Sequence, residues 1–221
     1  MEKTLIAIPC LDSMSTTFVS SLINMVGSGL YDNFNITFEV QSLVYESRDR
    51  LAAKAVNEKY KRILWLDSDM AFEPDLLQRL SADMDKGYKF VSAVYYRRKL
   101  PTKPVLCKSL DWYVDDDGWA QTIEEGFDEI PDGIFEIAAC GFGAVLMDVD
   151  LLTYVLLKYK VPPFTPLPGL SEDYAFCHRL NGMGVKMVAD SRIPIKHCGL
   201  WLYGKSDWAL QKKVAQNERS L

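Results

Sequence analysis

The first half of the chain alternates short apolar runs with stretches whose apolar residues recur every three or four positions. The apolar runs predict four strands, at residues 5–8, 36–44, 63–66 and 90–94. The periodic stretches between them predict three helices, at residues 15–26, 48–60 and 74–86. This order of elements predicts a parallel sheet with helices on both of its faces.

The second half has a different character. From about Tyr95 to Phe135 the chain is aromatic, acidic and rich in turn residues, and the Asp-Asp-Asp-Gly sequence at 115–118 predicts a hairpin. We therefore expect short antiparallel strands beside the main sheet. Further strands are predicted at 134–139, 144–147, 185–188 and 193–195, and helices after Asp148, at 172–180 and in the tail after Ser206. The predicted fold class is α/β, one domain over residues 1–221 with a mostly parallel central sheet flanked by helices and a small antiparallel addition.

Composition narrows the classes of function. The chain has 221 residues, of which 48% are hydrophobic and 25% charged, as in ordinary globular domains. The net charge of −5 disfavours direct binding to nucleic acid through the phosphate backbone. No apolar run approaches the roughly 20 residues of a transmembrane helix, and we expect no signal peptide. The five cysteines are scattered and odd in number, so we expect reduced thiols and a cytoplasmic location.

The strongest candidate for chemistry is Asp67-Ser68-Asp69, which directly follows the apolar run at 63–66. Ligands of open α/β sheets bind beyond the carboxyl ends of the strands, where these residues are expected to lie. Two neighbouring carboxylates repel each other, and a divalent cation removes that cost while accepting phosphate oxygens as further ligands. The alternative interpretation is an acidic loop that begins the next helix.

A second acidic pair, Glu172-Asp173, follows Ser171 at the start of a predicted helix. A carboxylate placed beside other acids can act as a general base that takes a proton from a hydroxyl group. The alternative is structural, because acidic side chains in the first turn stabilise a helix through its dipole.

Two histidines and two arginines complete the set of candidate site residues. His197 ends a late predicted strand and is a candidate metal ligand, although a lone histidine is often structural. His178 is the weaker of the two histidines. Arg48 and Arg50 begin a predicted helix, where a guanidinium group and the helix dipole both favour phosphate; a solvated helix start is the alternative.

Taken in order, these motifs resemble those of GT-A fold glycosyltransferases, particularly the large family-2 type. The resemblance covers about residues 4–200 and rests on the first strand ending at Pro9, Ser47-Arg48-Asp49, the Asp67-Ser68-Asp69 motif, the glycine-containing strand at 140–147, the motif at 171–179, and the strand from Gly184 leading to His197. Residues 40–47 lack that family's usual Asp-Asp/Asn-Gly-Ser turn, Asp49 replaces its usual Asn, and no Gln-x-x-Arg-Trp motif follows the second acidic pair.

The resemblance implies a role for each matched residue. Asp69 would bind the metal, Asp67 the metal or the donor ribose, and His197 would complete the metal shell. Asp173, with Glu172 beside it, would supply the base. Other residues are implied on the donor side: Pro9, Arg48, Arg50 and Ser68. The expected cofactors are Mn²⁺ or Mg²⁺ and a UDP- or GDP-sugar.

The predicted function is therefore metal-dependent transfer of a sugar to an acceptor hydroxyl. Inversion at the anomeric carbon is the expected outcome, and retention is the alternative, since the resembled fold supports both. Residues 1–95 would bind the nucleotide-sugar, residues 96–204 would hold the acceptor and the base, and residues 205–221 would form a tail helix. The acceptor could be a glycan, a lipid-linked sugar, a protein or a modified base. Five aromatic residues could stack on a sugar or belong to the core or surface: Trp112, Tyr113, Trp119, Trp201 and Tyr203. A nucleotidyltransferase or a non-catalytic nucleotide- or sugar-binding domain is the alternative, and a phosphatase with an Asp-x-Asp motif fits the sequence less well.

Overall fold

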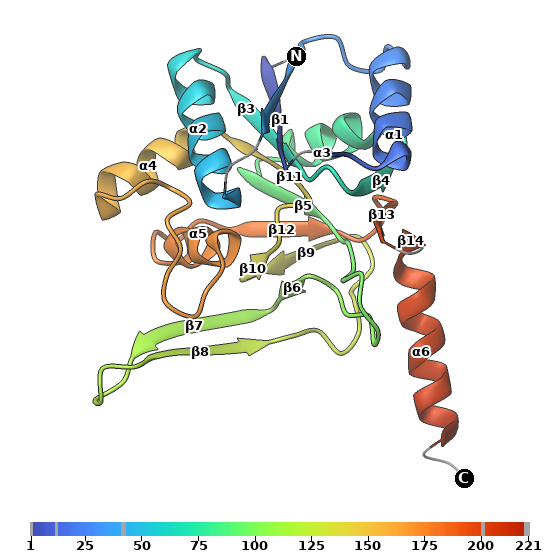
Figure 1. Cartoon of the computed structure of the whole chain (residues 1–221), viewed down its shortest axis with the longest axis vertical. Helices are drawn as coiled ribbons and strands as arrows, with labels where there is room; N and C mark the ends of the chain where they lie inside the picture. The colour runs from blue at the N-terminus through green and yellow to red at the C-terminus, as the bar shows by residue number, and fades with distance from the viewer. Residues whose placement is uncertain (1, 12, 41–42, 200–201, 219–221) are drawn as a thin grey trace.

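The computed structural model describes residues 2–11, 13–40, 43–199 and 202–218. It is an α/β structure built on a mixed seven-stranded sheet with helices on both faces (Figure 1). The strand order is β2-β1-β3-β11-β5-β12-β9. In chain order these strands are β1 (Thr4–Cys10), β2 (Phe34–Val40), β3 (Arg62–Leu66), β5 (Phe90–Ala93), β9 (Ile134–Ile137), β11 (Ala144–Asp148) and β12 (Met187–Asp190).

The sheet is less parallel than predicted. Five strands run in one direction, but β11 and β9 run against their neighbours. Strand β11 lies between β3 and β5, although it follows both in the chain. The apolar pattern of residues 144–147 correctly predicts a strand. It cannot show that the strand enters the centre of the sheet in the opposite direction, because a buried strand is apolar on both faces whatever its direction.

The described residues form six helices: α1 (Thr16–Gly27), α2 (Val44–Asn57), α3 (Leu76–Met84), α4 (Asp150–Tyr159), α5 (Glu172–Asn181) and α6 (Lys205–Glu218). Strand residues alternate between the two faces of the sheet. Leu5 and Trp65 pack in a core cluster with buried residues of α2, α4 and α5. Ile6 and Leu64 pack on the other face, in a cluster with buried residues of α1 and α3. The predicted layers are therefore confirmed.

Two predicted boundaries are wrong near the candidate site. Strand β2 spans Phe34–Val40, residues 41 and 42 of the predicted strand at 36–44 lie outside the described residues, and α2 already begins at Val44. Arg48 consequently lies in the second turn of α2 and is buried, instead of beginning the helix. The apolar residues Val44 and Tyr45 are typical of a strand. They instead form the first turn of α2, and the buried side chains of this helix, such as Leu51 and Ala55, lie further along it.

Boundaries in the second half also shift. Val185 closes the turn after α5 by donating its N–H to the carbonyl of Leu180, so β12 begins at Met187. Ile193 lies in the turn that follows β12, which moves the next strand, β13, to Ile195–Cys198. The predicted strand at 134–139 is divided into β9 and a short β10 (Ala139–Cys140).

The predicted antiparallel addition is present as a long hairpin of β7 (Ser109–Val114) and β8 (Ala120–Glu125), which lies beside the main body in Figure 1. Asp115 accepts backbone N–H groups of Asp117 and Trp119 at its tip, and Gly118 has the positive φ of 87° that this turn needs. The short strand β6 (Leu106–Cys107) pairs with β10. Within the described part of the chain, no helix is long and apolar enough to cross a membrane.

An aromatic cluster fixes the loop between α4 and α5, which contains Pro162, Pro163, Pro166 and Pro168, against the sheet. Phe164 is fully buried, stacks on Phe176 with ring centroids 4.8 Å apart, and meets Trp65 edge to face at 4.9 Å. The backbone N–H of Phe164 donates to Asp49 of α2 at 2.9 Å. Asp49, which stands where the resembled family has Asn, therefore anchors the loop that leads into α5.

Replacing Phe164 by Ala should lower the free energy of unfolding by about 3–5 kcal/mol, because buried contacts are lost and the surrounding side chains relax only partially into the cavity. Urea denaturation monitored by circular dichroism measures the change. The matched control is Trp119→Ala, since Trp119 is 72% exposed at the hairpin end and its loss should cost little. Equal destabilisation by both variants would contradict the assigned role of Phe164.

Candidate functional site

The acidic motif lies where the sequence predicts, at the carboxyl end of a central strand. Asp67, Ser68 and Asp69 form a tight turn after β3, in which Met70 donates its N–H to the carbonyl of Asp67 at 3.3 Å. The chain then enters a short strand, β4 (Met70–Phe72), which the sequence analysis did not predict.

The unpredicted strand brings His197 to Asp69. Strand β4 pairs antiparallel with β13, so that His197 lies opposite Met70, and β14 (Leu202–Tyr203) completes this small sheet. The N–H of Cys198 donates to the carbonyl of Asp69 at 2.7 Å. As a result, the Nε2 atom of His197 lies 3.2 Å from the Oδ2 atom of Asp69.

The backbone sets the orientation of the imidazole. Nδ1 of His197 lies 3.0 Å from the carbonyl oxygen of Tyr96, and because a carbonyl only accepts, Nδ1 carries a proton; Nε2 donates to the Asp69 carboxylate when it carries a proton as well. Nε2 therefore faces Asp69. Burial favours the neutral form of Asp69, but His197, by hydrogen bond and charge, and Arg98 outweigh it and lower the pKa of this carboxyl group.

Arg48 joins the two acidic motifs. Its side chain is only 2% exposed, and its Nη2 atom lies 2.9 Å from Oδ1 of Asp67. Its Nε atom lies 3.2 Å from Oε1 of Glu172, at the start of α5. The guanidinium also lies over the rings of Trp65 and Phe142, with its carbon 5.7 and 5.4 Å from their centroids. Burial raises the pKa of Asp67 in spite of the Arg48 charge.

Glu172 and Asp173 have different surroundings. Glu172 is committed to Arg48, whereas Asp173 accepts hydrogen bonds from the Ser171 hydroxyl and, at 2.8 Å, from the N–H of Tyr174. Burial, followed by the charge of Glu172, raises the pKa of Asp173 to about 6. A carboxyl group with a pKa near neutrality is suited to general-base chemistry.

Two pockets flank the Arg48 bridge. The first, of about 250 Å³, is lined by Pro9, Cys10, Leu11, Val44 and Ser47 together with Asp67, Ser68 and Asp69. The second, of about 470 Å³, contains Asp173 and is lined by Arg97, Thr122, Glu124 and Tyr174 among others. Arg48 is bonded to Asp67, which lines the first pocket, and to Glu172, which precedes Asp173 of the second pocket in the chain.

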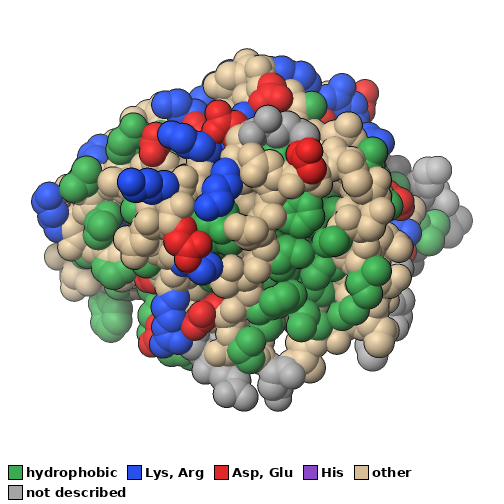
Figure 2. Space-filling model, turned by 90° about the horizontal axis from the view of Figure 1, so that it is seen from above, with side chains coloured by type: hydrophobic (Ala, Val, Ile, Leu, Met, Phe, Trp, Pro, Cys, Tyr) green, Lys and Arg blue, Asp and Glu red, His purple; other side chains and the backbone are tan. Residues whose placement is uncertain are grey.

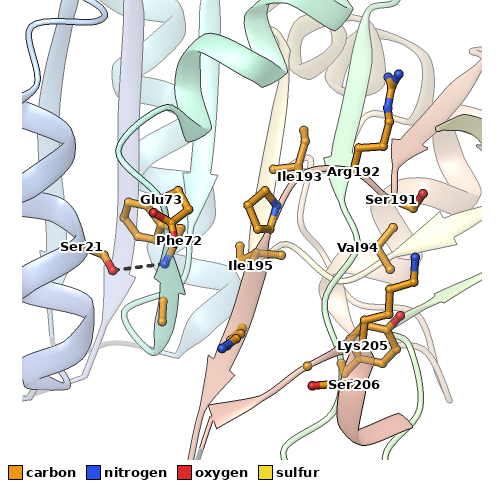
Figure 3. A pocket seen from close by; sticks show the side chains of 15 residues that line it. Ser21, Phe72, Glu73, Val94, Ser191, Arg192, Ile193, Ile195, Lys205 and Ser206 are labelled. Carbon is orange, nitrogen blue, oxygen red and sulfur yellow. Dashed lines mark hydrogen bonds between the residues drawn. The ribbon is translucent and has the colours of Figure 1, made fainter. Parts of the chain in front are cut away.

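A further cavity, of about 400 Å³, is separate from this site. Ser191, Arg192 and Lys205 surround it beside β4 and β13, and the dashed bond in Figure 3 is the Phe72 N–H donating to Ser21. None of the predicted site residues lines this cavity.

The structure does not bring every candidate together. Arg50 is exposed and pairs with Glu39 at 2.8 Å and with Glu46 at 3.6 Å, away from the Arg48 cluster. His178 packs edge to face against Trp112, with centroids 5.9 Å apart. Trp112 itself donates to the carbonyl of Pro168 at 2.9 Å. Tyr113 and Trp119 are exposed on the hairpin, while Trp201 and the Tyr203 side chain lie outside the described residues.

Sequence reasoning missed two contributors. Arg98 is 55% exposed, and its Nη1 atom lies 2.6 Å from Oδ2 of Asp69. This residue lies outside every helix and strand, so no periodic pattern in the sequence could predict its position. Tyr95 packs against the turn at 141–143, where a Cβ on Gly141 would come within 2.0 Å of its hydroxyl and one on Gly143 within 2.9 Å of its ring. The two glycines in the predicted strand at 140–147 were the available indication of such close packing.

A divalent cation fits this donor set in part. Among the described residues, no group of three or more His, Cys, Asp or Glu side chains is arranged as a ready metal site. Asp69 and His197 are nevertheless adjacent, and their 3.2 Å separation is close to the roughly 3 Å between neighbouring ligands on a cation with bonds of about 2.1 Å. Asp67 faces Arg48 instead.

Comparison with known proteins defines the class of fold. No protein-family model and no curated protein matches the chain. Of the solved structures, 256 chains match. One of them is the crystal structure of A197 from STIV, which shares 20% identity with this chain and superposes with a TM-score of 0.62 over 88% of this chain and 85% of that one. At this identity the likeness shows the fold alone, an α/β domain with a mixed central sheet flanked by helices.

Replacing Arg48 by Met should lower the free energy of unfolding by about 2–4 kcal/mol at neutral pH, because two partly buried carboxylates lose their counter-ion. The loss should shrink in acid, where protonation removes the uncompensated charge. Thermal unfolding at several pH values measures both effects. The matched control is the exposed neighbour Arg50→Met, which should have little effect; a pH-independent loss in Arg48→Met would argue against the bridge.

Proposed function

We propose that this protein is a metal-dependent glycosyltransferase of the GT-A fold, which moves a sugar from a nucleotide-sugar to an acceptor hydroxyl with inversion at the anomeric carbon. One observation carries the proposal. One pocket is lined by Asp67 and Asp69 and another by Asp173, and the buried Arg48 bonds both Asp67 and Glu172, the neighbour of Asp173. A transfer reaction between two substrates needs two such pockets held in a fixed relation.

The first pocket suits the donor. Pro9 and Leu11 offer an apolar surface for a nucleotide base, while Asp67 and Asp69 lie at its other side. Asp69 and His197 would hold Mn²⁺ or Mg²⁺, and the diphosphate oxygens of the donor would take the remaining positions. When bound, the cation would neutralise charge that develops on the departing diphosphate. Arg98, which is exposed, would release Asp69 at little cost.

The second pocket suits the acceptor. Asp173 takes the proton of the acceptor hydroxyl, whose oxygen forms a bond to the anomeric carbon. The bond from that carbon to the diphosphate breaks, and its electron pair leaves with the diphosphate. Glu172 cannot serve equally well, because its carboxylate is held by Arg48. Glu172 therefore positions Arg48, and through it Asp67.

A non-catalytic nucleotide-binding domain is the second candidate. The observation that favours it is the neutralisation of Asp67 by Arg48 and of Asp69 by Arg98, which leaves neither carboxylate without a counter-ion. Donor binding is common to both proposals, and turnover distinguishes them.

Thermal unfolding with UDP-, GDP-, CMP- and dTDP-sugars, each with and without Mn²⁺, tests the donor site. A matching donor at about 100 times its dissociation constant should add roughly 2.7 kcal/mol of stability. The gain should require the metal and disappear in Asp69→Asn. Asp116→Asn, an exposed change at the hairpin end, is the control and should keep the gain. No metal-dependent shift with any donor would reject the donor site.

Turnover should increase as the pH rises through about 6, since only the deprotonated form of Asp173 accepts the proton. Asp173→Asn should reduce turnover by about 10²–10⁴-fold and leave the donor-induced stabilisation intact. Ser171→Ala should move the rise to higher pH, because the Ser171 hydrogen bond lowers the pKa of Asp173. A hydrolysis or transfer assay over pH 4–9 measures all three. Unchanged turnover in Asp173→Asn would exclude this residue as the base.

A further inference from the structure

A basic loop, residues 97–103, follows β5 and reaches the acidic turn after β3. Four of its residues are cations: Arg97, Arg98, Lys99 and Lys103. The base of the loop is fixed, because the N–H of Arg97 donates to the carbonyl of Lys103 at 2.9 Å. Of the four cations, Arg98 alone forms an ion pair within the described part of the chain, in which its Nη1 atom lies 2.6 Å from Oδ2 of Asp69. The loop therefore concentrates positive charge beside the candidate site in a chain whose net charge is −5.

Cations on another surface of the molecule have carboxylates beside them. Figure 2 shows the end that carries α1 and α2, where Lys and Arg side chains gather over one half and Asp and Glu side chains lie among them. Arg50 of α2, for example, pairs with Glu39 at 2.8 Å. The cations of the basic loop instead lie at the two pockets of the candidate site. Arg97 lines the second pocket, and the guanidinium of Arg98 contacts Asp69 of the first.

Two arginines bond the carboxylates of the first pocket, and they differ in their freedom to move. Arg48 is only 2% exposed and is bonded to Asp67 and Glu172 at once, so it cannot turn toward a ligand. Arg98 is 55% exposed, and its ion-pair partner in the described chain is Asp69 alone. An exposed ion pair contributes little stability, because water screens its charges. The guanidinium of Arg98 can therefore exchange one anionic partner for another.

One oxygen of Asp69 is contacted by two side chains. Its Oδ2 atom lies 3.2 Å from Nε2 of His197 and 2.6 Å from Nη1 of Arg98. A divalent cation held by Asp69 and His197 would repel the guanidinium from this oxygen, because the two positive charges would lie within a few ångströms of each other. Phosphate oxygens bound to the same cation would then offer Arg98 a new anionic partner, and the planar guanidinium matches a phosphate through paired N–H donors.

We propose that Arg98 is a ligand of the donor diphosphate, which it binds in exchange for Asp69 when a divalent cation enters the site. This inference rests on the proposed function, because it takes the first pocket to hold a nucleotide-sugar. The formal charges support it. Each phosphate of such a donor carries one negative charge, so a divalent cation balances the diphosphate and leaves the charge of Asp69 over, which Arg98 neutralises. The same guanidinium stabilises the further negative charge that the diphosphate gains as it departs.

Titration calorimetry of the full chain tests the proposal with Mn²⁺ alone, with Mn²⁺ and inorganic pyrophosphate, and with Mn²⁺ and UDP or GDP. Arg98→Gln should weaken binding of pyrophosphate and of the nucleoside diphosphate at least tenfold, about 1.4 kcal/mol. Its affinity for Mn²⁺ alone should rise, because Asp69 loses a competing cation. The matched control is Lys99→Gln, an exposed neighbour in the same loop, which should bind every probe nearly as the wild type does. Circular dichroism confirms that each variant is folded.

Three results would overturn the proposal. Unchanged affinity of Arg98→Gln for pyrophosphate and for UDP and GDP would show that Arg98 does not contact the diphosphate. Tighter binding of every probe would make Arg98 a competitor of the metal and nothing more. A loss confined to UDP or GDP would place the contact on the nucleoside. A wild type that binds these diphosphates with Mn²⁺ but transfers no sugar would reject the proposed function and leave the role of Arg98 standing, whereas a wild type that binds none of them would reject both.

Discussion

The candidate site depends on one buried ion-pair bridge. Arg48 reaches from α2 to Asp67 after β3 and to Glu172 at the start of α5, and so fixes three elements relative to one another. The aromatic rings of Trp65 and Phe142 lie against the guanidinium and limit its positions. A buried pair of this kind contributes little net stability against an apolar alternative, yet it is costly to break. The bridge matters for the geometry of the site, because it holds together two acidic motifs that are distant in the sequence.

The second organising contact is a strand pair outside the main sheet. Pairing of β4 with β13 places His197 beside Asp69, and the Tyr96 carbonyl orients the imidazole. Since β4 begins directly after Asp69, the acidic turn is held between the main sheet and this small one. A turn held in this way would suit the proposed metal–diphosphate site, because ligands must be held in place before the substrate arrives.

The four acidic side chains of the candidate site differ in their hydrogen-bond and ion-pair partners. Asp67 and Glu172 share Arg48, Asp69 faces His197, and Asp173 lines the second pocket with its pKa raised to about 6. Chemically similar carboxylates thus have different environments, which is how one site can combine electrostatic and proton-transfer roles.

Local patterns in the sequence determined the strands β1, β3, β5 and β11, the helices on both faces, the hairpin tip at 115–118 and the position of Asp67 and Asp69 after a buried strand, because periodicity and turn chemistry are local properties. Tertiary structure decided the rest. The direction of β11, the start of α2 at Val44, the existence of β4 and the ion pairs of Arg48 and Arg98 depend on partners distant in the chain. His197 shows the difference plainly: its residue type made it a candidate, but only the pairing of β13 with β4 placed it 3.2 Å from Asp69.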